Sequence, residues 1–287
     1  MDIDVLGALA VRENGISITP TAPKPRQVLA LLALHADQVV PVSALIEELW
    51  AGEPPRSART TLQTYVLQLR ALIATALEQE RDPAADSEGG APAGVAGGRT
   101  AKDVLVTLPG GYLLNSNGGT SDVREFDRLA GTGYRAMDAG DFPGAARLLR
   151  EALALWSGPA FADVQGGVQL DMETRRLEET RLCALDQRIE ADLRLGRHRE
   201  LLAELTVLAS RYRTHENLHG QFMLALHRSG RRGEALDVYQ RLRGMLVREL
   251  GLEPSAALRR LQRSILMAGP ESLAEATDAG GERLVRV

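Results

Sequence analysis

The sequence predicts a mainly α-helical protein with a small β component: a winged helix-turn-helix domain followed by an all-α domain of tetratricopeptide-like helical hairpins. Short alternating apolar stretches, typical of strands, lie at both ends of a first segment, and three helical patterns lie between them. Farther along, Gly196 and Gly230 stand 34 residues apart, each before a helix start, which is the tetratricopeptide period. We therefore expect a first domain at 1–114, a linker at 115–121 and a second domain at 122–268.

Length and composition limit the classes of protein. A chain of 287 residues is long enough for two domains that each bury a core. No apolar run reaches membrane-spanning length and the N-terminus is acidic, so we expect a cytoplasmic protein. Cys183 is the only cysteine, which excludes an intrachain disulfide. It lies beside Leu182 and Leu185, and we expect it to be packed in the interior.

The first domain begins with a strand pattern. Apolar residues alternate in two short stretches around Asn14-Gly15, a pair that favours a tight hairpin turn. Crowded apolar residues from 25 to 35 then predict a buried helix, and Pro41 opens a second helix. A third helix is predicted from about Ser57 to Leu77.

The rest of the first domain is a loop followed by a hairpin. Residues 79–100 are rich in Gly, Ala, Pro and acids without periodicity, so they predict a mobile loop. Val104, Val106 and Leu108 restore an alternating strand pattern, and a turn at 109–111 makes this a terminal hairpin, the wing. At the other end of the chain, we expect 269–287 to be a disordered tail.

The second domain shows a third turn of the same kind. Gly140 precedes a helix start, but it stands 56 residues before Gly196, which exceeds one repeat. Residues 156–169, which include two Gly-containing pairs, account for this as an insertion. Stacked hairpins of this type leave a surface that usually holds another protein.

The third helix carries the candidate DNA-binding face. Leu62, Val66 and Leu69 recur at helical spacing toward the core, so the opposite face is polar and free of acids. Hydroxyl, amide and guanidinium groups can contact base edges or phosphates. By periodicity alone a solvated helix face explains the pattern better, since every amphipathic helix has a polar side. The candidate DNA-binding residues are Arg59, Thr60, Thr61, Gln63, Thr64, Tyr65, Gln68 and Arg70 of this helix, with Lys102, Thr107 and Tyr112 of the terminal hairpin.

Several motifs resemble those of the Streptomyces antibiotic regulatory proteins. Among them are Leu45-Ile46-Glu47-Glu48-Leu49-Trp50 and Pro109-Gly110-Gly111-Tyr112 in the first half and Ala152-Leu153-Ala154-Leu155-Trp156 in the second. The resemblance implies an OmpR-type winged helix, like a two-component output domain, joined to a bacterial transcriptional activation domain. The order of the motifs along nearly the whole chain makes the combined match specific.

The same resemblance implies function. Such a protein binds direct repeats overlapping a promoter's −35 region, usually as two protomers side by side, and recruits RNA polymerase with its primary sigma factor. Its targets are genes for antibiotics or other secondary metabolites. By motif, Thr61 and Arg70 contact DNA, and a loop with Trp50, Glu53 and Arg56 faces polymerase. The wing departs from the family pattern, because Pro109 stands where an arginine often enters the minor groove.

Two other functions are weighed against this one. His215, Glu216 and His219 match the spacing of a zinc metalloprotease, but Ala225 occupies the position of a third histidine and a repeat-helix start explains the motif better. With no phosphate-binding loop either, we expect no enzyme, no metal and no cofactor. The second alternative is a tetratricopeptide-like scaffold that binds protein and not DNA, whose binding would be insensitive to salt.

Overall fold

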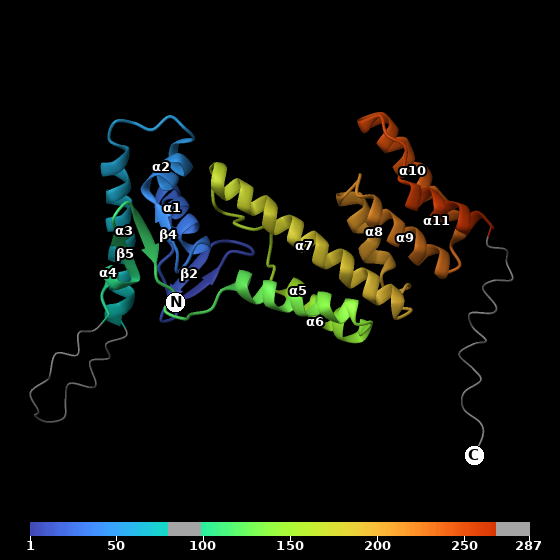
Figure 1. The fold of residues 1–287 in the computed structure, drawn as a ribbon, viewed down its shortest axis with the longest axis horizontal. Helices are drawn as coiled ribbons and strands as arrows, with labels where there is room; N and C mark the ends of the chain where they lie inside the picture. Colours follow the sequence, from blue (N-terminus) through green and yellow to red (C-terminus); the bar gives the residue numbers. More distant parts are fainter. Residues whose placement is uncertain (80–98, 268–287) are drawn as a thin grey trace, which may run out of the picture. The chain divides into compact units, whose positions relative to one another are not determined.

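A computed structural model of the chain describes residues 1–79 and 99–267. The loop predicted at 79–100 and the tail predicted at 269–287 lie almost entirely outside this part (Figure 1). The chain divides into two compact units, the first formed by 1–131 and 151–182 and the second by 132–150 and 183–287. The predicted linker at 115–121 between a DNA-binding and an activation domain stays a prediction.

The first unit begins with a three-stranded antiparallel sheet. Its strands β1 (Asp2–Asp4), β2 (Ala10–Glu13) and β3 (Ile16–Ser17) pair in that order. Asn14 and Gly15 connect β2 to β3 with φ values of 52° and 80°, as a two-residue turn of a twisted hairpin requires. The predicted hairpin is confirmed.

Three helices follow and build the core of the first unit. The predicted helices are present as α1 (Pro23–Leu34), α2 (Val42–Trp50) and α3 (Ala58–Gln79), and each contacts the other two. Val28 to Leu32 of α1 are all 0% exposed, which explains why this segment is apolar on every side.

A second sheet closes the winged helix in the order β4-β6-β5. Strands β5 (Leu105–Leu108) and β6 (Gly111–Leu114) form the predicted wing hairpin, and β4 (Val39–Pro41) pairs with β6 but was not predicted. Val104, predicted in a strand, instead ends the short helix α4 (Ala101–Val104). Thr100 and Asp103 form a capping box that starts this helix and overrides the alternating pattern.

The predicted insertion after residue 155 belongs to the first unit. In this insertion, the Ser157 N–H donates to the Leu6 carbonyl at 2.9 Å, and the Phe161 N–H donates to the Val5 carbonyl at 3.0 Å. The Asp122 carboxylate accepts from the backbone N–H groups of Val5 and Leu6. Burial raises the pKa of this carboxyl, although the two hydrogen bonds act to lower it. This insertion therefore completes the first unit and is not only a spacer between repeats.

The second unit is built from helical hairpins. Gly140, Gly196 and Gly230 end helices with φ values of 75°, 76° and 80°, a conformation that favours glycine, which confirms the three predicted turns. Cys183 is exposed, so its predicted packing was wrong. Helices α5 (Asp122–Asp138), α6 (Phe142–Ala154) and α7 (Val168–Arg194) contribute to both units, and α8 (Leu202–Arg211), α9 (Glu216–Arg228), α10 (Arg232–Leu250) and α11 (Ala256–Met267) belong to the second.

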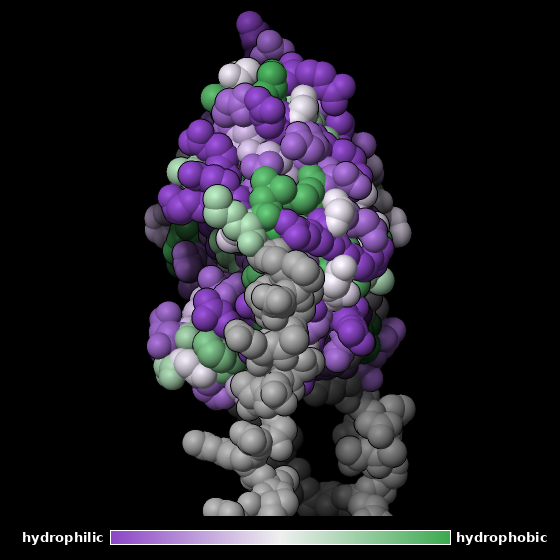
Figure 2. All heavy atoms as spheres, turned by 90° about the vertical axis from the view of Figure 1, so that its right-hand side faces the viewer, coloured by the Kyte–Doolittle hydropathy of each residue, from purple (hydrophilic) through white to green (hydrophobic). Residues whose placement is uncertain are grey.

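The surface of the second unit is mostly hydrophilic where Figure 2 views it, with a small apolar area among hydrophilic residues. Exposed apolar residues on this unit include Val247, Leu250, Leu252 and Leu266. Among the described helices, none combines the length and the apolar character needed to cross a bilayer.

Candidate nucleic-acid interface

The buried face of α3 orients the candidate interface. Leu62, Val66, Leu69 and Ile73 are at most 2% exposed and pack toward α1 and α2. Because α3 is anchored along this stripe, its opposite face points to solvent with a fixed rotation about the helix axis.

The outward face of α3 is polar and carries no acid between positions 58 and 77. Thr61 and Tyr65 are half-buried at its margins, and the Thr64 hydroxyl donates to the Thr60 carbonyl at 3.1 Å, which leaves its oxygen available as an acceptor. The exposed residues of the predicted set on this helix are Arg59, Thr60, Gln63, Thr64 and Gln68.

Leu67 was missed by the sequence reasoning. It is 63% exposed and lies one helical turn after the Gln63–Thr64 pair, in the middle of the polar face. An exposed leucine in this position can contact a thymine methyl group. The available signal was its position out of phase with the buried stripe.

Arg70 joins α3 to the wing. Its guanidinium donates to the Leu105 carbonyl at 3.1 and 2.7 Å and to the Thr107 hydroxyl at 2.7 Å. The expected contact between Arg70 and DNA stays a prediction, but these three bonds already give the side chain a structural role. It holds β5 beside α3, which sets the position of the wing.

The other wing residues differ in accessibility. Thr107 is exposed on β5, whereas Tyr112 is only 7% exposed on β6 and offers DNA little surface. Lys102 is exposed, but it lies on α4 and not on the hairpin where it was predicted. In the wing turn, Gly110 follows Pro109 and has a φ of 84°. The Gly110 carbonyl accepts a hydrogen bond from the Val42 N–H at 2.9 Å.

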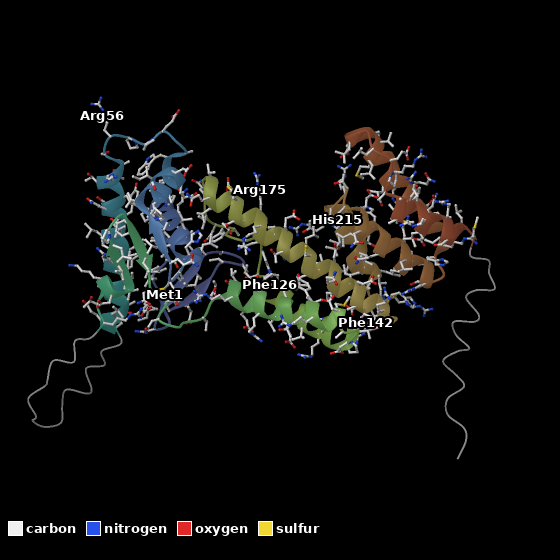
Figure 3. All side chains as sticks on the ribbon, viewed as in Figure 1. Met1, Arg56, Phe126, Phe142, Arg175 and His215 are labelled. Atoms are coloured by element: carbon white, nitrogen blue, oxygen red, sulfur yellow. The ribbon has the colours of Figure 1, made fainter. Side chains whose placement is uncertain are left out.

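The loop between α2 and α3 is exposed from 51 to 57. Ala51 and Gly52 leave α2 in the left-handed region, with φ of 48° and 90°. Trp50 is half-buried, while Glu53 and Arg56 are exposed, and the Arg56 side chain points away from the ribbon (Figure 3). The loop therefore holds one acidic and one basic side chain in solvent.

A buried carboxylate at the end of α2 was also missed. Glu48 is 2% exposed and accepts from the Gln27 amide (2.9 Å) and from the backbone N–H groups of Gly167, Gln169 (2.9 Å) and Leu170 (3.2 Å). Gly167 immediately precedes α7, and Gln169 and Leu170 lie in its first turn, where helices leave donors unpaired and favour negative charge. This side chain therefore joins α2, which precedes the exposed loop, to the start of α7.

The three residues of the metalloprotease motif, His215, Glu216 and His219, all make hydrogen bonds within the protein. His215 lies at the start of α9 (Figure 3), and its Nδ1 accepts from the Leu218 N–H at 3.3 Å. Glu216 accepts from the Ser255 N–H at 2.7 Å, and His219 is 5% exposed with Nδ1 at 3.0 Å from the His215 carbonyl. Over the described residues no three potential ligands come together for a metal.

Comparisons with known proteins cover almost the whole chain. Residues 121–266 match the family described as bacterial transcriptional activator domain, and residues 17–83 match the family described as transcriptional regulatory protein, C terminal. The regulatory protein DnrI of Streptomyces peucetius is 51% identical over 270 residues, which cover 94% of this chain and 93% of DnrI.

Two further relatives are larger than the matched region. The regulatory protein AfsR of Streptomyces coelicolor is 36% identical over 97% of this chain, which spans 25% of AfsR. The structure of Mycobacterium tuberculosis EmbR, solved in complex with a low affinity phosphopeptide, matches 97% of this chain and 69% of that chain with a TM-score of 0.78 and 31% identity.

Proposed function

Because the chain belongs to the Streptomyces antibiotic regulatory protein family of transcriptional activators, we propose that it reads promoter DNA through α3. The observation that carries this proposal is the outward face of α3, which is polar, free of acids and anchored on a buried stripe in a winged helix. Within the interface, Gln68 and Thr64 contact base edges, and Arg59 and Lys102 contact phosphates.

The family resemblance supports the finer parts of the proposal. Two protomers bind direct repeats side by side near a −35 element and recruit RNA polymerase holoenzyme with its primary sigma factor, in the bacterial cytoplasm. The regulated genes form a cluster for an antibiotic or another secondary metabolite. The exposed loop with Glu53 and Arg56 supplies the polymerase contact.

Footprinting tests DNA recognition directly. Genomic fragments enriched by the purified full chain are footprinted at two salt concentrations. We expect protected tandem repeats near a −35 element, with protection lost at high salt because bound arginines and lysines release counterions from phosphates. Gln68→Ala should weaken binding about tenfold, whereas Gln240→Ala, exposed on α10, should not. No enrichment by folded protein would instead favour the protein-binding scaffold.

The polymerase contact requires a different readout. Arg56→Glu and Glu53→Lys reverse exposed charges without touching α3, so both variants should footprint like the parent chain. In transcription with purified polymerase, each should lower activated transcript several-fold, because like charges across an interface repel. An equal loss of DNA affinity and of transcription in these variants would contradict a separate polymerase surface.

A further inference from the structure

A cavity of about 400 Å³ lies within the second unit, between α7, α9 and α11. Glu190 contributes from α7, Glu216 and Gln221 from α9, and Leu258 and Leu261 from α11. The candidate DNA and polymerase surfaces do not include any of these residues. A volume in this range suits a small molecule.

Gln221 lines the cavity and has a buried acceptor without a partner among the described residues. Its side chain is only 6% exposed, and its Nε2 donates to the Asp186 carbonyl at 2.9 Å. That bond fixes the orientation of the amide, so the acceptor is Oε1, which has no hydrogen-bond partner in the described part of the chain. A buried carbonyl without a donor is unfavourable, and this oxygen is shielded from solvent.

The charged side chains that line the cavity are both acidic, and Arg194, which does not line it, forms an ion pair with Glu190. Glu190 and Glu216 line the cavity, and no lysine or arginine does among the described residues. Each carboxylate uses one oxygen within the protein: Glu190 accepts from Arg194 at 2.7 Å, and Glu216 accepts from the Ser255 N–H at 2.7 Å. The remaining oxygens favour a cation with hydrogen-bond donors.

The remaining lining is largely apolar. Leu224 of α9 lies with Leu258 and Leu261 around the cavity, and Leu258 is 4% exposed. A hydrated metal ion would leave these side chains without a partner, whereas an organic body would cover them and gain from removing apolar surface from water.

We propose that this cavity binds a small amphipathic amine, whose ammonium group donates to the glutamates while its apolar body packs on the leucines. The inference does not depend on the proposed DNA-binding function. The ligand bridges α9 and α11, so its binding stabilises the second unit.

The test uses three molecules of one shape and different charge on the full chain. These are 2-(2-naphthyl)ethylamine, the neutral 2-(2-naphthyl)ethanol and the anionic 3-(2-naphthyl)propanoate, titrated by calorimetry. We expect the amine to bind about tenfold or more tightly than the alcohol, and the acid to bind least. Loss of one carboxylate in Glu190→Gln should weaken amine binding about tenfold. Asp237→Asn, which removes an exposed acid from α10, should leave it unchanged.

A second variant tests the location independently of charge. Leu261→Trp fills the cavity and should abolish binding in a chain whose helix content is unchanged. Equal binding of the three probes, no binding of the amine, or amine binding unaffected by Glu190→Gln would overturn the proposal. So would binding of the peptide acetyl-Leu-Arg-Leu-amide without binding of the amine, because the cavity would then be a protein-docking surface.

Discussion

At the scale of single residues, neighbours in sequence have opposite environments. Glu47 is exposed, whereas Glu48 is buried and accepts hydrogen bonds from Gln27 and the first turn of α7. A charged group removed from water is tolerated only when its oxygens are hydrogen-bonded in this way. Glu48 therefore acts as a joint within the first unit, although its residue type is that of an ordinary surface acid.

Replacing Glu48 by glutamine should destabilise the first unit. The amide would present an N–H group to backbone N–H donors, so we expect the free energy of unfolding to fall by about 2–3 kcal/mol. Urea denaturation followed by tryptophan fluorescence measures this, because Trp50 and Trp156 both lie in the first unit. The exposed control Glu53→Gln should stay within about 0.5 kcal/mol of the parent. Indistinguishable midpoints for both variants would contradict the role of Glu48.

Variants of Arg70 test whether this residue acts by positioning the wing or by its positive charge. Arg70→Ala should weaken DNA binding, because it removes the three hydrogen bonds that hold β5 beside α3. Lysine keeps the charge but not the planar fork of donors. We therefore expect Arg70→Lys to recover little of the lost affinity in a filter-binding titration. Full recovery by lysine would show that Arg70 acts as a phosphate contact only.

At the scale of elements, turn chemistry decides where the helices of the second unit end. Gly230 lies at φ 80° between α9 and α10. Gly233 is exposed inside α10, where an added Cβ would meet nothing within 4 Å. The two glycines stand three residues apart but satisfy different requirements, the first a left-handed turn and the second only space.

Substitution by alanine should affect the stability of the second unit differently at these two positions. Gly230→Ala should destabilise the second unit by about 1–2 kcal/mol, the cost of a left-handed residue with a side chain. Gly233→Ala should be neutral or stabilising by up to about 1 kcal/mol, because alanine favours helix. Thermal unfolding followed by circular dichroism compares them, and a Gly230→Ala transition at or above that of Gly233→Ala would contradict the turn assignment.

At the scale of the whole molecule, function depends on where charge lies and not on its sum. The chain has a net charge of −4, yet the outward face of α3 carries no acid from 58 to 77. A locally favourable surface is enough to approach phosphates, because screening at physiological salt limits the reach of distant charges to about 8 Å. The acidic residues of the second-unit cavity lie outside this face and make other contacts.

Acidification should destabilise the second unit selectively. Burial lowers the pKa of His198, His219 and His227 below the ordinary value of 6.5, and all three belong to that unit. Below about pH 6.5 the unfolded chain therefore binds more protons than the folded chain, and stability falls as the pH falls. Circular dichroism melting at pH 7.5 and 5.5 should show a transition that moves down while the tryptophan signal of the first unit stays in place.

The histidine variant supplies the control for this pH effect. His219 is the most buried of the three, and His219→Gln removes one group that titrates in this range. The variant should lose less stability than the parent between the two pH values. An unchanged pH dependence would show that His219 does not contribute to it.

Much of the fold was predictable because its causes are local. The stripe of Leu62, Val66 and Leu69 determines how α3 rotates, and Asn14-Gly15 determines one hairpin. The exposed face of α3 followed from the same period, so most of the candidate residues on that helix are exposed, while their contact with DNA stays a prediction. Leu67 was missed, since a search for polar side chains passes over an exposed leucine.

By itself, the sequence determined the order of the helices and the polar face of α3, because periodicity, caps and turns act over a few residues. The family was identified from the resemblance of its motifs. Tertiary structure alone decided that Glu48 is buried, that Arg70 contacts the wing and that Tyr112 is core. Glu48 and Gly167 are 119 residues apart, and Arg70 and Leu105 are 35 apart. Whether a polar side chain meets solvent or a distant backbone depends on how elements pack, and no short sequence pattern carries that information.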